Sequence, residues 1–392
     1  MRAIDQLNHW MTTTGRCSGD PIEIVSHFCT SLVEAGIPLW RVNIGQRFAN
    51  PLLIAWGVVW TPDGTNVYDV THARMLTDSY VGSSFEYVFE NQKPLHKSLR
   101  NLDPQKDHAS YLEFAADGGT DYYATFLQYG DGSQHGCTFA TRAEEGFAPE
   151  HLSMIEAARS GLSSAMEPIT MRKSTRSLLR TYLGAGPAEA VWSGSIQRGE
   201  RTTLEAIIIF SDLRGFTSFS ETQSEQEVFE ALDGYFEVVV QAVEKNGGEV
   251  LKFMGDGVLS ILPIAEANDF ARRCRDAANA AEQILADLST LNQSRKEAGK
   301  SELAIGIGLH AGAVSYGNIG SQSRLDFTVL GRAVNLASRI ESLTKTLETS
   351  VLATASVANH APELFRQRGK HKVPGVSDPI EVFALTNAPN VG

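Results

Sequence analysis

The chain has 392 residues and a formal charge of −12, with 42% hydrophobic and 20% charged residues. The length predicts two domains, and the composition is ordinary for a soluble globular protein. The negative charge argues against nucleic acid and anionic membranes as partners, because those surfaces are held mainly by clustered Lys and Arg.

The first half of the chain has the pattern of an α+β domain. Helical periodicity covers residues 21–36 and 149–166, and strand-like runs cover residues 52–60, 122–127 and 136–141. All five tryptophans precede residue 200, so the two halves of the chain build their cores from different residues. This difference predicts a domain boundary near residue 200.

A short motif suggests what kind of α+β domain this is. Residues 146–152, Gly-Phe-Ala-Pro-Glu-His-Leu, lie between a strand pair and a long helix and resemble the end of a GAF domain. The resemblance implies a GAF-like sensor over residues 1–167, with a PAS-like or an unrelated α+β domain as alternatives. Its aromatic residues could line a pocket for a small-molecule ligand, although aromatic residues in strands more often belong to the core.

Residues 168–201 connect the two halves. They contain a basic amphipathic run at residues 171–180, followed by a stretch with several Gly and Ser residues. One interpretation is a signalling helix with a hinge. The other is a solvated linker helix, since charge runs are usually exposed to water.

The second half alternates strands and helices. The apolar run at residues 206–210 is typical of a strand buried on both faces. The other expected elements are helices at 222–246, 267–291 and 333–347, a hairpin at 249–253 and 258–262, and a strand at 303–310. Helices on one face of a mostly antiparallel sheet would make a ferredoxin-like α+β palm.

Two carboxylates stand at strand ends in this half. Asp212 follows the buried strand, and Asp256 occupies the Gly-Asp-Gly turn of the hairpin. If the hairpin lies beside that strand, both carboxylates reach one edge of the sheet. There they could hold two divalent ions roughly 3.5–4 Å apart, the spacing used for in-line phosphoryl displacement. Magnesium prefers such oxygen ligands together with substrate phosphates.

Several long motifs then follow in a specific order. They are Phe-Ser-Asp-Leu-Arg-Gly-Phe-Thr at 210–217, Lys-Phe-Met-Gly-Asp-Gly at 252–257, Ile-Gly-Ile-Gly-Leu-His-Ala-Gly at 305–312, Gly-Asn-Ile-Gly-Ser at 317–321, and the run at 327–339 that ends Asn-Leu-Ala-Ser-Arg. Residues 202–386 therefore resemble a class III nucleotidyl cyclase catalytic domain, which we expect to occupy residues 202–392. The resemblance implies conversion of ATP or GTP to the 3′,5′-cyclic monophosphate with release of pyrophosphate.

The resemblance implies a role for each motif residue. Asp212 and Asp256, with the carbonyl of Leu213, would hold two Mg²⁺ or Mn²⁺ ions per active site. Asn335 would orient the ribose, and Arg339, one helical turn later, would stabilise charge on the α-phosphate. The backbone N–H groups that can cradle phosphate oxygens at the start of the next helix belong to Gly215, Phe216 and Thr217.

Base choice depends on Lys252 and Thr328. In the family, Lys with Asp or Thr reads adenine, whereas guanine-selective members usually carry Glu with a small residue. Lys252 can donate to the adenine N1 acceptor, so ATP is the expected substrate. Asp326 is two residues out of place for the commoner Asp. The Thr variant resembles a subgroup that responds to bicarbonate, which makes bicarbonate a candidate effector.

In this family the metal-binding and base-binding sets come from different protomers, so the resemblance implies a homodimer with ATP in two shared sites. A guanylate cyclase and a non-catalytic nucleotide-binding signalling module are the alternatives. A diguanylate cyclase would carry Gly-Gly-Asp/Glu-Glu-Phe at the hairpin, which this chain lacks. Near the carboxyl end, Pro374 replaces a commoner Lys, so a triphosphate contact by Lys370 or Lys372 is not expected.

No segment suggests a membrane anchor or an export signal. The longest strongly apolar run is well short of the roughly 20 residues that span a bilayer, and the amino terminus lacks the apolar core of a signal peptide. The four cysteines form no Cys-x-x-Cys pair, which is typical of proteins in a reducing compartment. We expect a cytoplasmic protein without a membrane partner.

Overall fold

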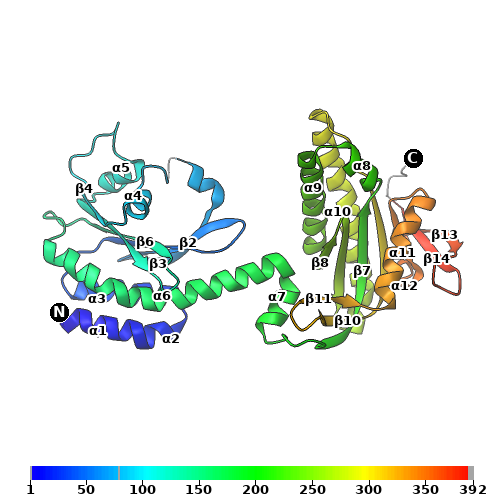
Figure 1. Ribbon diagram of the computed structural model, residues 1–392, viewed down its shortest axis with the longest axis horizontal. Helices are drawn as coiled ribbons and strands as arrows, with labels where there is room; N and C mark the ends of the chain where they lie inside the picture. The colour runs from blue at the N-terminus through cyan, green and yellow to red at the C-terminus, as the bar shows by residue number, and fades with distance from the viewer. Residues whose placement is uncertain (1, 78–79, 387–392) are drawn as a thin grey trace. The chain divides into compact units, whose positions relative to one another are not determined.

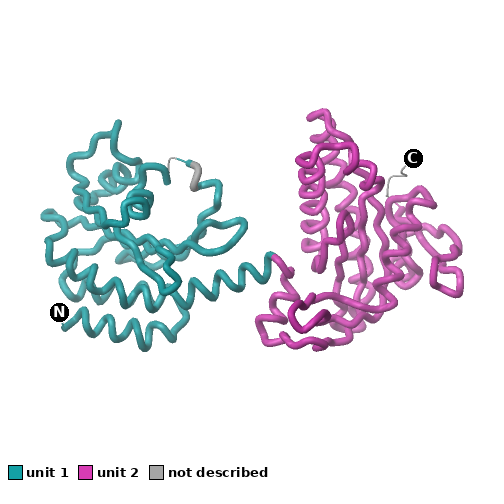
Figure 2. The backbone as a smooth tube through the Cα atoms, in the orientation of Figure 1, with its two compact units in different colours: residues 1–181 teal, residues 182–392 magenta. Residues whose placement is uncertain are grey.

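A computed structural model of the chain describes residues 2–77 and 80–386. The chain forms two compact units, Met1–Thr181 and Tyr182–Gly392, which Figure 2 colours teal and magenta. We call them the N-terminal unit and the C-terminal unit. Among helices of the described ranges, none is long and apolar enough to cross a bilayer. Residues 387–392 of the expected catalytic domain, and 1 and 78–79 of the expected sensor, lie outside the described residues.

The N-terminal unit is built on a six-stranded antiparallel sheet with the order β3-β2-β1-β6-β5-β4. Its strands are β1 (Arg41–Arg47), β2 (Leu53–Thr61), β3 (Gly64–Thr71), β4 (Leu95–Ser98), β5 (Asp121–Gln128) and β6 (Gln134–Thr141). Alternate residues of each strand face opposite sides of the sheet. On β1, for example, Val42 and Ile44 are buried in the main core of this unit.

Helices cover both faces of this sheet (Figure 1). α1 (Arg2–Trp10), α3 (Pro21–Glu34) and α6 (Pro149–Leu183) share the core that contains Val42 and Ile44. On the other face, α4 (Ser84–Asn91) and α5 (Ala109–Ala116) pack in a second cluster with β5. The short elements are η1 (Met11–Gly15), α2 (Arg16–Ser18) and η2 (His72–Leu76).

The expected α+β character of the N-terminal half is confirmed, while its GAF-like identity stays a prediction. Helix α6 contains Pro168 in its interior and continues past residue 167, the expected end of the sensor, without a break. The compact units divide after Thr181, two residues before this helix ends. Whether residues 168–201 act as a separate signalling segment stays a prediction.

The C-terminal unit is built on an eight-stranded sheet with the order β13-β14-β12-β10-β7-β9-β8, in which β11 pairs with β10. Only β10 and β12 pair in parallel among the described strands. The strands are β7 (Arg201–Leu213), β8 (Glu249–Met254), β9 (Gly257–Ile264), β10 (Ile305–Gly320), β11 (Leu325–Leu330), β12 (Val351–Thr354), β13 (Phe365–His371) and β14 (Ile380–Leu385).

The central strand β7 is buried on both faces, as its apolar run predicts. Ile207 and Ile209 pack with α9 (Glu225–Lys245) and α10 (Phe270–Glu297). Ala206 and Ile208 point the other way and pack with α11 (Arg332–Thr346). The expectation that all helices lie on one face of this sheet is therefore wrong. Periodicity shows that a helix has a buried side, but not which face of the sheet receives it.

Local sequence accounts for the ends of the long helix α9. The hydroxyl of Ser224 accepts a hydrogen bond from the amide of Glu227, which is an N-cap. Gly247, with φ of 73°, follows the last turn and ends the helix. The remaining short elements of this unit are α7 (Ala185–Trp192), α8 (Phe216–Thr222), η3 (Ala267–Asp269), α12 (Ala355–Ala358) and η4 (Pro362–Leu364).

Candidate active site

The structure brings Asp212 and Asp256 together at one edge of the C-terminal sheet. Asp212 is the penultimate residue of β7 and pairs in register with Gly257 of β9. The β8–β9 hairpin has a two-residue loop, Gly255–Asp256, between the paired Met254 and Gly257. Gly255 has φ of 66°, as the first central position of a type II′ turn requires. This turn sets Asp256 beside the end of β7.

The electrostatics of the pair favour a cation. Burial, the charge of Asp256 and the hydrogen bond that protonated Asp212 donates to the Asp256 carboxylate raise the pKa of Asp212 to about 7. Two carboxyl groups this close cannot both ionise without a compensating positive charge. Oxygen donors with unbalanced negative charge are the ligand set that Mg²⁺ and similar hard cations prefer. In the described part of the chain, no group of three or more His, Cys, Asp or Glu side chains is arranged so that it could hold a metal ion by itself.

A third carboxyl group, which the sequence interpretation missed, lies near this pair. Glu341 of α11 is only 8% exposed, and its charge adds to the rise in the pKa of Asp212. Burial raises the pKa of Glu341 itself, while nearby Ser342 and Arg214 lower it. A Cβ atom on Gly306 of β10 would lie 2.3 Å from a carboxyl oxygen of Glu341. The alternating Ile-Gly-Ile-Gly motif was the available signal, because it indicates a strand face that another element approaches closely.

The loop after β7 contains the predicted phosphate-binding residues. Leu213 ends β7, and the amide of Arg214 donates to the carbonyl of Ala304 over 2.8 Å. Gly215 is the N-cap of α8, with φ of 69° and no side-chain cap. The first N–H groups of α8, which include those of Phe216 and Thr217, therefore receive no side-chain cap from Gly215.

Asn335 and Arg339 both lie on α11, one turn apart on the same side of the helix. Asn335 is exposed and Arg339 is half-buried. The guanidinium of Arg339 lies against Gly375, where an added Cβ would approach it to 3.0 Å. Among the described residues, neither side chain forms a hydrogen bond or ion pair with Asp212 or Asp256.

Lys252 has a partner that the sequence interpretation set aside. Its ammonium forms an ion pair with the carboxylate of Asp326, because β11 lies next to β8. Thr328, on the same strand as Asp326, is only 7% exposed. A cavity of about 480 Å³ is lined by Lys252, Ile319, Gly320, Ser321, Arg324, Leu325 and Asp326. Of the two residues predicted to read the base, Lys252 lines this cavity.

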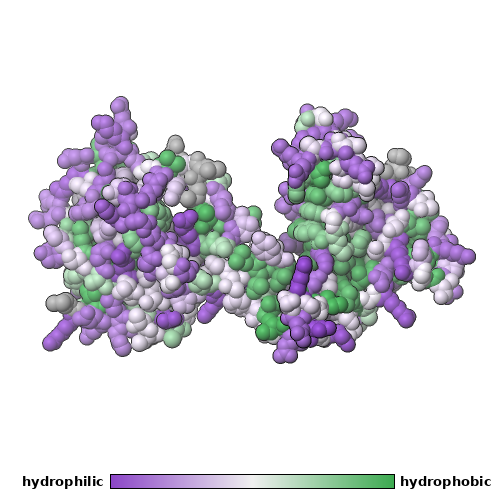
Figure 3. Space-filling view, in the orientation of Figure 1, coloured by the Kyte–Doolittle hydropathy of each residue, from purple (hydrophilic) through white to green (hydrophobic). Residues whose placement is uncertain are grey.

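The surface around this cavity is unusually apolar. Five large hydrophobic side chains on β8, β10 and β11 are exposed, namely Phe253, Met254, Ile319, Leu325 and Leu330. We call them the apolar patch. In Figure 3 hydrophobic residues gather on the visible face of the C-terminal unit, over its strands. Exposed apolar surface of this kind is typical of an interface with another protein.

The same part of the chain is similar to known proteins. Residues 200–387 match the family described as adenylate and guanylate cyclase catalytic domain. An adenylate cyclase of Anabaena cylindrica is 34% identical over 200 residues, which are 49% of this chain and 38% of that protein. Adenylate cyclase 1 of Rhizobium meliloti is 31% identical over 185 residues, 46% of this chain and 27% of that protein. The chain thus spans well under half the length of these relatives.

A solved structure supports the fold. The structure of a bacterial light-regulated adenylyl cyclase superposes with a TM-score of 0.50 at 24% identity. The superposition covers 68% of this chain and 87% of the other.

Proposed function

Since residues 200–387 match the adenylate and guanylate cyclase catalytic domain, we propose that the chain is an adenylate cyclase. It converts ATP to 3′,5′-cyclic AMP and pyrophosphate. The ribose 3′-oxygen forms a bond to the α-phosphorus, loses its proton, and displaces the oxygen that links the α- and β-phosphates. The observation that carries the proposal is the close Asp212–Asp256 pair, in which the pKa of Asp212 is raised to about 7.

Two divalent ions, Mg²⁺ or Mn²⁺, complete each site in this proposal. Asp212, Asp256 and the carbonyl of Leu213 hold them, and the mutual repulsion of the two carboxyl groups fits this role. When bound, such ions acidify the attacking hydroxyl and neutralise the triphosphate. The chain itself contributes the position of the two carboxylates at adjoining strand ends, which sets where the triphosphate sits.

The other residues position substrate and stabilise charge. Backbone N–H groups after Gly215, including those of Phe216 and Thr217, cradle phosphate oxygens. Asn335 orients the ribose, and Arg339 donates to the α-phosphate oxygens as negative charge develops there. An intramolecular attack needs little beyond this alignment, because nucleophile and electrophile belong to one molecule.

Selectivity for adenine is assigned to Lys252 and Thr328. The ion pair with Asp326 supports this role for Lys252, because it holds the ammonium at the wall of the cavity between β8 and β11. From there Lys252 can donate to the N1 acceptor of adenine, whereas the corresponding atom of guanine carries a proton.

The proposed active form is a homodimer. Within one chain Asn335 and Arg339 form no bond to Asp212 or Asp256, and the apolar patch beside Lys252 is exposed. Both features support sites shared with a second copy. We further propose that the N-terminal unit regulates the cyclase and that the protein works in the cytoplasm, where its four free thiols stay reduced. Bicarbonate is a candidate effector.

The proposal is tested by incubating the purified full chain with ATP or GTP and Mg²⁺ or Mn²⁺, and measuring cyclic nucleotide and pyrophosphate. We expect cyclic AMP and pyrophosphate in equal amounts, and a loss of at least about a hundredfold in Asp256→Asn. Asp233→Asn, on an exposed position of α9, is the matched control and should stay active. Preference for GTP would replace the proposal with a guanylate cyclase, and no turnover of either nucleotide would favour a non-catalytic module.

A further inference from the structure

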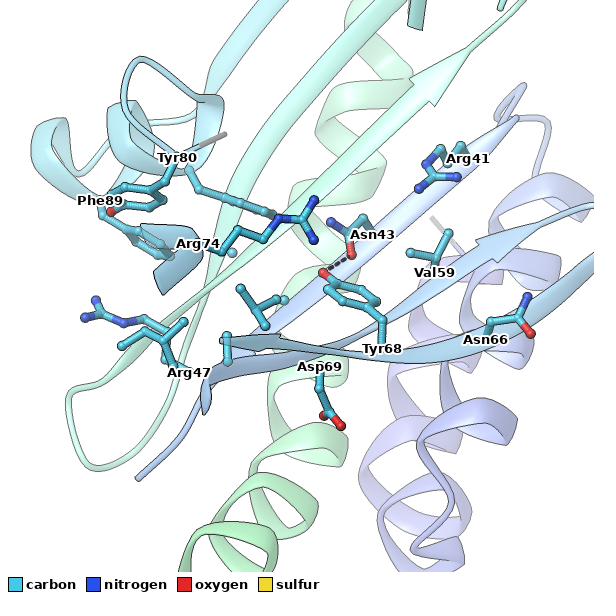
Figure 4. A pocket seen from close by; sticks show the side chains of 16 residues that line it. Arg41, Asn43, Arg47, Val59, Asn66, Tyr68, Asp69, Arg74, Tyr80 and Phe89 are labelled. Atoms are coloured by element: carbon cyan, nitrogen blue, oxygen red, sulfur yellow. Dashed lines mark hydrogen bonds between the residues drawn. The ribbon is translucent and has the colours of Figure 1, made fainter. Parts of the chain in front are cut away.

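The N-terminal unit contains a cavity that the proposed cyclase reaction does not use. Its volume is about 540 Å³, within the range of roughly 300–1,000 Å³ that small-molecule sites occupy. It lies on the sheet face opposite α3 and α6, where β1, β2 and β3 form the floor and α4 forms a wall (Figure 4). Residues from six separate elements converge on it, namely β1, β2, β3, η2, α4 and β6.

Small residues on the sheet create the space. Gly45 of β1 and Gly136 of β6 have no side chain to fill the space above the sheet. The ring of Phe85 from α4 lies directly over Gly136. On the other side, the ring of Tyr68 lies over Gly57, its partner in register on β2. A Cβ atom on Gly57 would come within 2.4 Å of that ring. The rings of Phe85 and Tyr68, each lying over a glycine, therefore form two flat walls of a narrow slot.

The cavity has an excess of positive charge. Three arginines line it, Arg41, Arg47 and Arg74, against one carboxylate, Asp69. In Figure 4 the carboxylate of Asp69 points to the opposite side of β3 from Tyr68. Burial lowers the pKa of Lys173 of α6, on the other face of the sheet, and the charge of Asp69 opposes that shift. Asp69 therefore does little to balance the arginines inside the cavity.

Two of these arginines, Arg41 and Arg47, form no ion pair in the described part of the chain. They lie over the rings of Phe114 and Phe89 instead. The Nε atom of Arg41 is buried without a hydrogen-bond partner in the described structure. A buried donor without a partner costs free energy unless a ligand supplies an acceptor.

Several polar groups lie together at one end of the slot. The hydroxyl of Tyr68 donates to Oδ1 of Asn43 over 2.7 Å, which leaves the amide nitrogen of Asn43 as a donor. Burial raises the pKa of Tyr68, and the charges of Arg41 and Arg74 oppose that rise, so both guanidinium groups lie near the phenol. The other end is mainly aromatic, with Phe85, Phe89 and Tyr80, and the guanidinium of Arg47 lies there over the ring of Phe89. Burial raises the pKa of the Tyr80 hydroxyl at that end. The charge of Arg47 opposes this rise, and the charges of Glu86 and Glu90 add to it.

We propose that this cavity binds a small organic anion with a flat apolar body. Its carboxylate or phosphate group accepts hydrogen bonds from Arg41, Arg74 and Asn43. Its flat body lies between Tyr68 and the aromatic side chains of α4, over Gly45. A guanidinium recognises carboxylate and phosphate groups by the same hydrogen bonds. The experiment therefore compares a carboxylate ligand with a phosphate ligand.

The test uses the full chain in isothermal titration calorimetry with three probes that share one naphthalene ring system. They are 2-naphthoate, 2-naphthyl phosphate and the neutral 2-naphthol. We expect one site per chain and binding of at least one anion about tenfold tighter than 2-naphthol, because a charge-assisted hydrogen bond contributes at least that factor. The anion that binds more tightly shows whether the cavity prefers a carboxylate or a phosphate group. If neither anion binds below about 1 mM, or if 2-naphthol binds equally well, the proposal is wrong.

Variants tie the binding to this cavity. Arg41→Gln should weaken the anion about tenfold and leave 2-naphthol unchanged. Gly45→Leu should abolish binding of all three probes, since a Cβ there meets Phe85 only at 3.6 Å and the longer side chain fills the slot. Arg142→Gln is the control, because Arg142 is an exposed arginine of this unit that lies over Trp40, outside the cavity. Unchanged anion affinity in a folded Arg41→Gln protein would overturn the proposal.

Discussion

At the scale of single residues, the dominant feature is the carboxyl pair of Asp212 and Asp256. Each group is a common strand-end or turn residue by itself. Together they share a half-buried space in which Asp212 holds its proton up to neutral pH. Glu341, on the helix behind them, adds further negative charge.

This pair predicts how stability depends on pH. The pKa of Asp212 is raised from 3.8 to about 7 in the folded chain, so between these values the folded state binds more protons than the unfolded state. The free energy of unfolding therefore falls as pH rises through this window. Above it, Mg²⁺ should stabilise the chain by replacing the lost proton. Thermal unfolding at about pH 5.5 and about pH 8.5, with and without Mg²⁺, measures this.

The variant Asp256→Asn is the control for that measurement. It removes one of the two charges, so the added stability from Mg²⁺ at high pH should largely disappear. Equal stabilisation by Mg²⁺ at both pH values, or in the variant, would contradict the assignment of a cation to this pair.

A second prediction at this scale concerns Lys252. Its ion pair with Asp326 is about half exposed, so it contributes little to stability, on the order of 0–1 kcal/mol. We expect Lys252→Ala to lower kcat/KM for ATP about tenfold relative to GTP, because the hydrogen bond to adenine is lost. Asp326→Asn should lower the same ratio by less, since it only frees the lysine side chain. Both variants should keep the melting temperature.

A drop in the ATP-to-GTP ratio that tracks a loss of folding would argue against this role. So would an unchanged ratio in a folded Lys252→Ala protein. Steady-state kinetics with both nucleotides, together with thermal unfolding of each variant, separate these outcomes.

At the scale of elements, the contact between β10 and α11 decides where α11 lies. Ile305, Ile307 and Leu309 face the core with α9 and α10. Between them, Gly306 and Gly308 form a flat stripe on the other side. That stripe lets the backbone of α11 approach the strand closely, and this approach fixes the height of Asn335 and Arg339 above the sheet.

Adding one methyl group to this contact should therefore be costly. A Cβ atom on Gly308 would lie 2.3 Å from the carbonyl oxygen of Ala337 and 2.5 Å from the amide of Glu341. Both atoms belong to the helix backbone and cannot rotate away. We expect Gly308→Ala to lower the free energy of unfolding by about 3 kcal/mol, at the upper end for overpacking. Chemical denaturation measures this change.

Gly312→Ala, on the same strand, gives a graded comparison. There the added Cβ would come closest to the side-chain methyl of Ala333, at 3.0 Å, with the ring of His310 at an ordinary 3.5 Å and no backbone atom among the nearest contacts, so a smaller loss of about 1 kcal/mol is expected. Equal effects of the two variants would show that the close approach at Gly308 does not determine the stability of this contact.

At the scale of the whole molecule, the proposed site is incomplete in one chain. The carboxylates lie at the ends of β7 and the β8–β9 hairpin, and Asn335 and Arg339 lie on α11 without a bond to them. The apolar patch beside Lys252 offers a surface for a second copy. A symmetric dimer would then contain two equivalent sites, each drawing on both chains.

Shared sites predict complementation. Asp256→Asn and Arg339→Ala should each be nearly inactive alone. Mixed in equal amounts, half of the dimers are heterodimers, and each heterodimer keeps one intact site of two. Activity should therefore recover to about a quarter of the unmutated protein. Cyclic AMP formation before and after mixing measures this, and the absence of recovery in a mixture shown to exchange subunits would contradict shared sites.

The sequence alone determined the local features of the site. Apolar periodicity predicts β7, α9 and α11, and the Gly-Asp-Gly turn predicts the hairpin that carries Asp256. These predictions depend on neighbours in the chain, because turn geometry and helix or strand periodicity are set within a few residues. The family resemblance of residues 202–386 has the same origin, since its motifs are continuous segments.

Only the tertiary structure decided which distant groups meet. It pairs Lys252 with Asp326, sets Glu341 behind the carboxylates, and puts α11 on the sheet face opposite α9 and α10. It also assembles the arginine-lined cavity from strands and a helix far apart in the chain. Periodicity shows that one side of an element is buried. What lies against that side depends on long-range packing, which no local pattern contains.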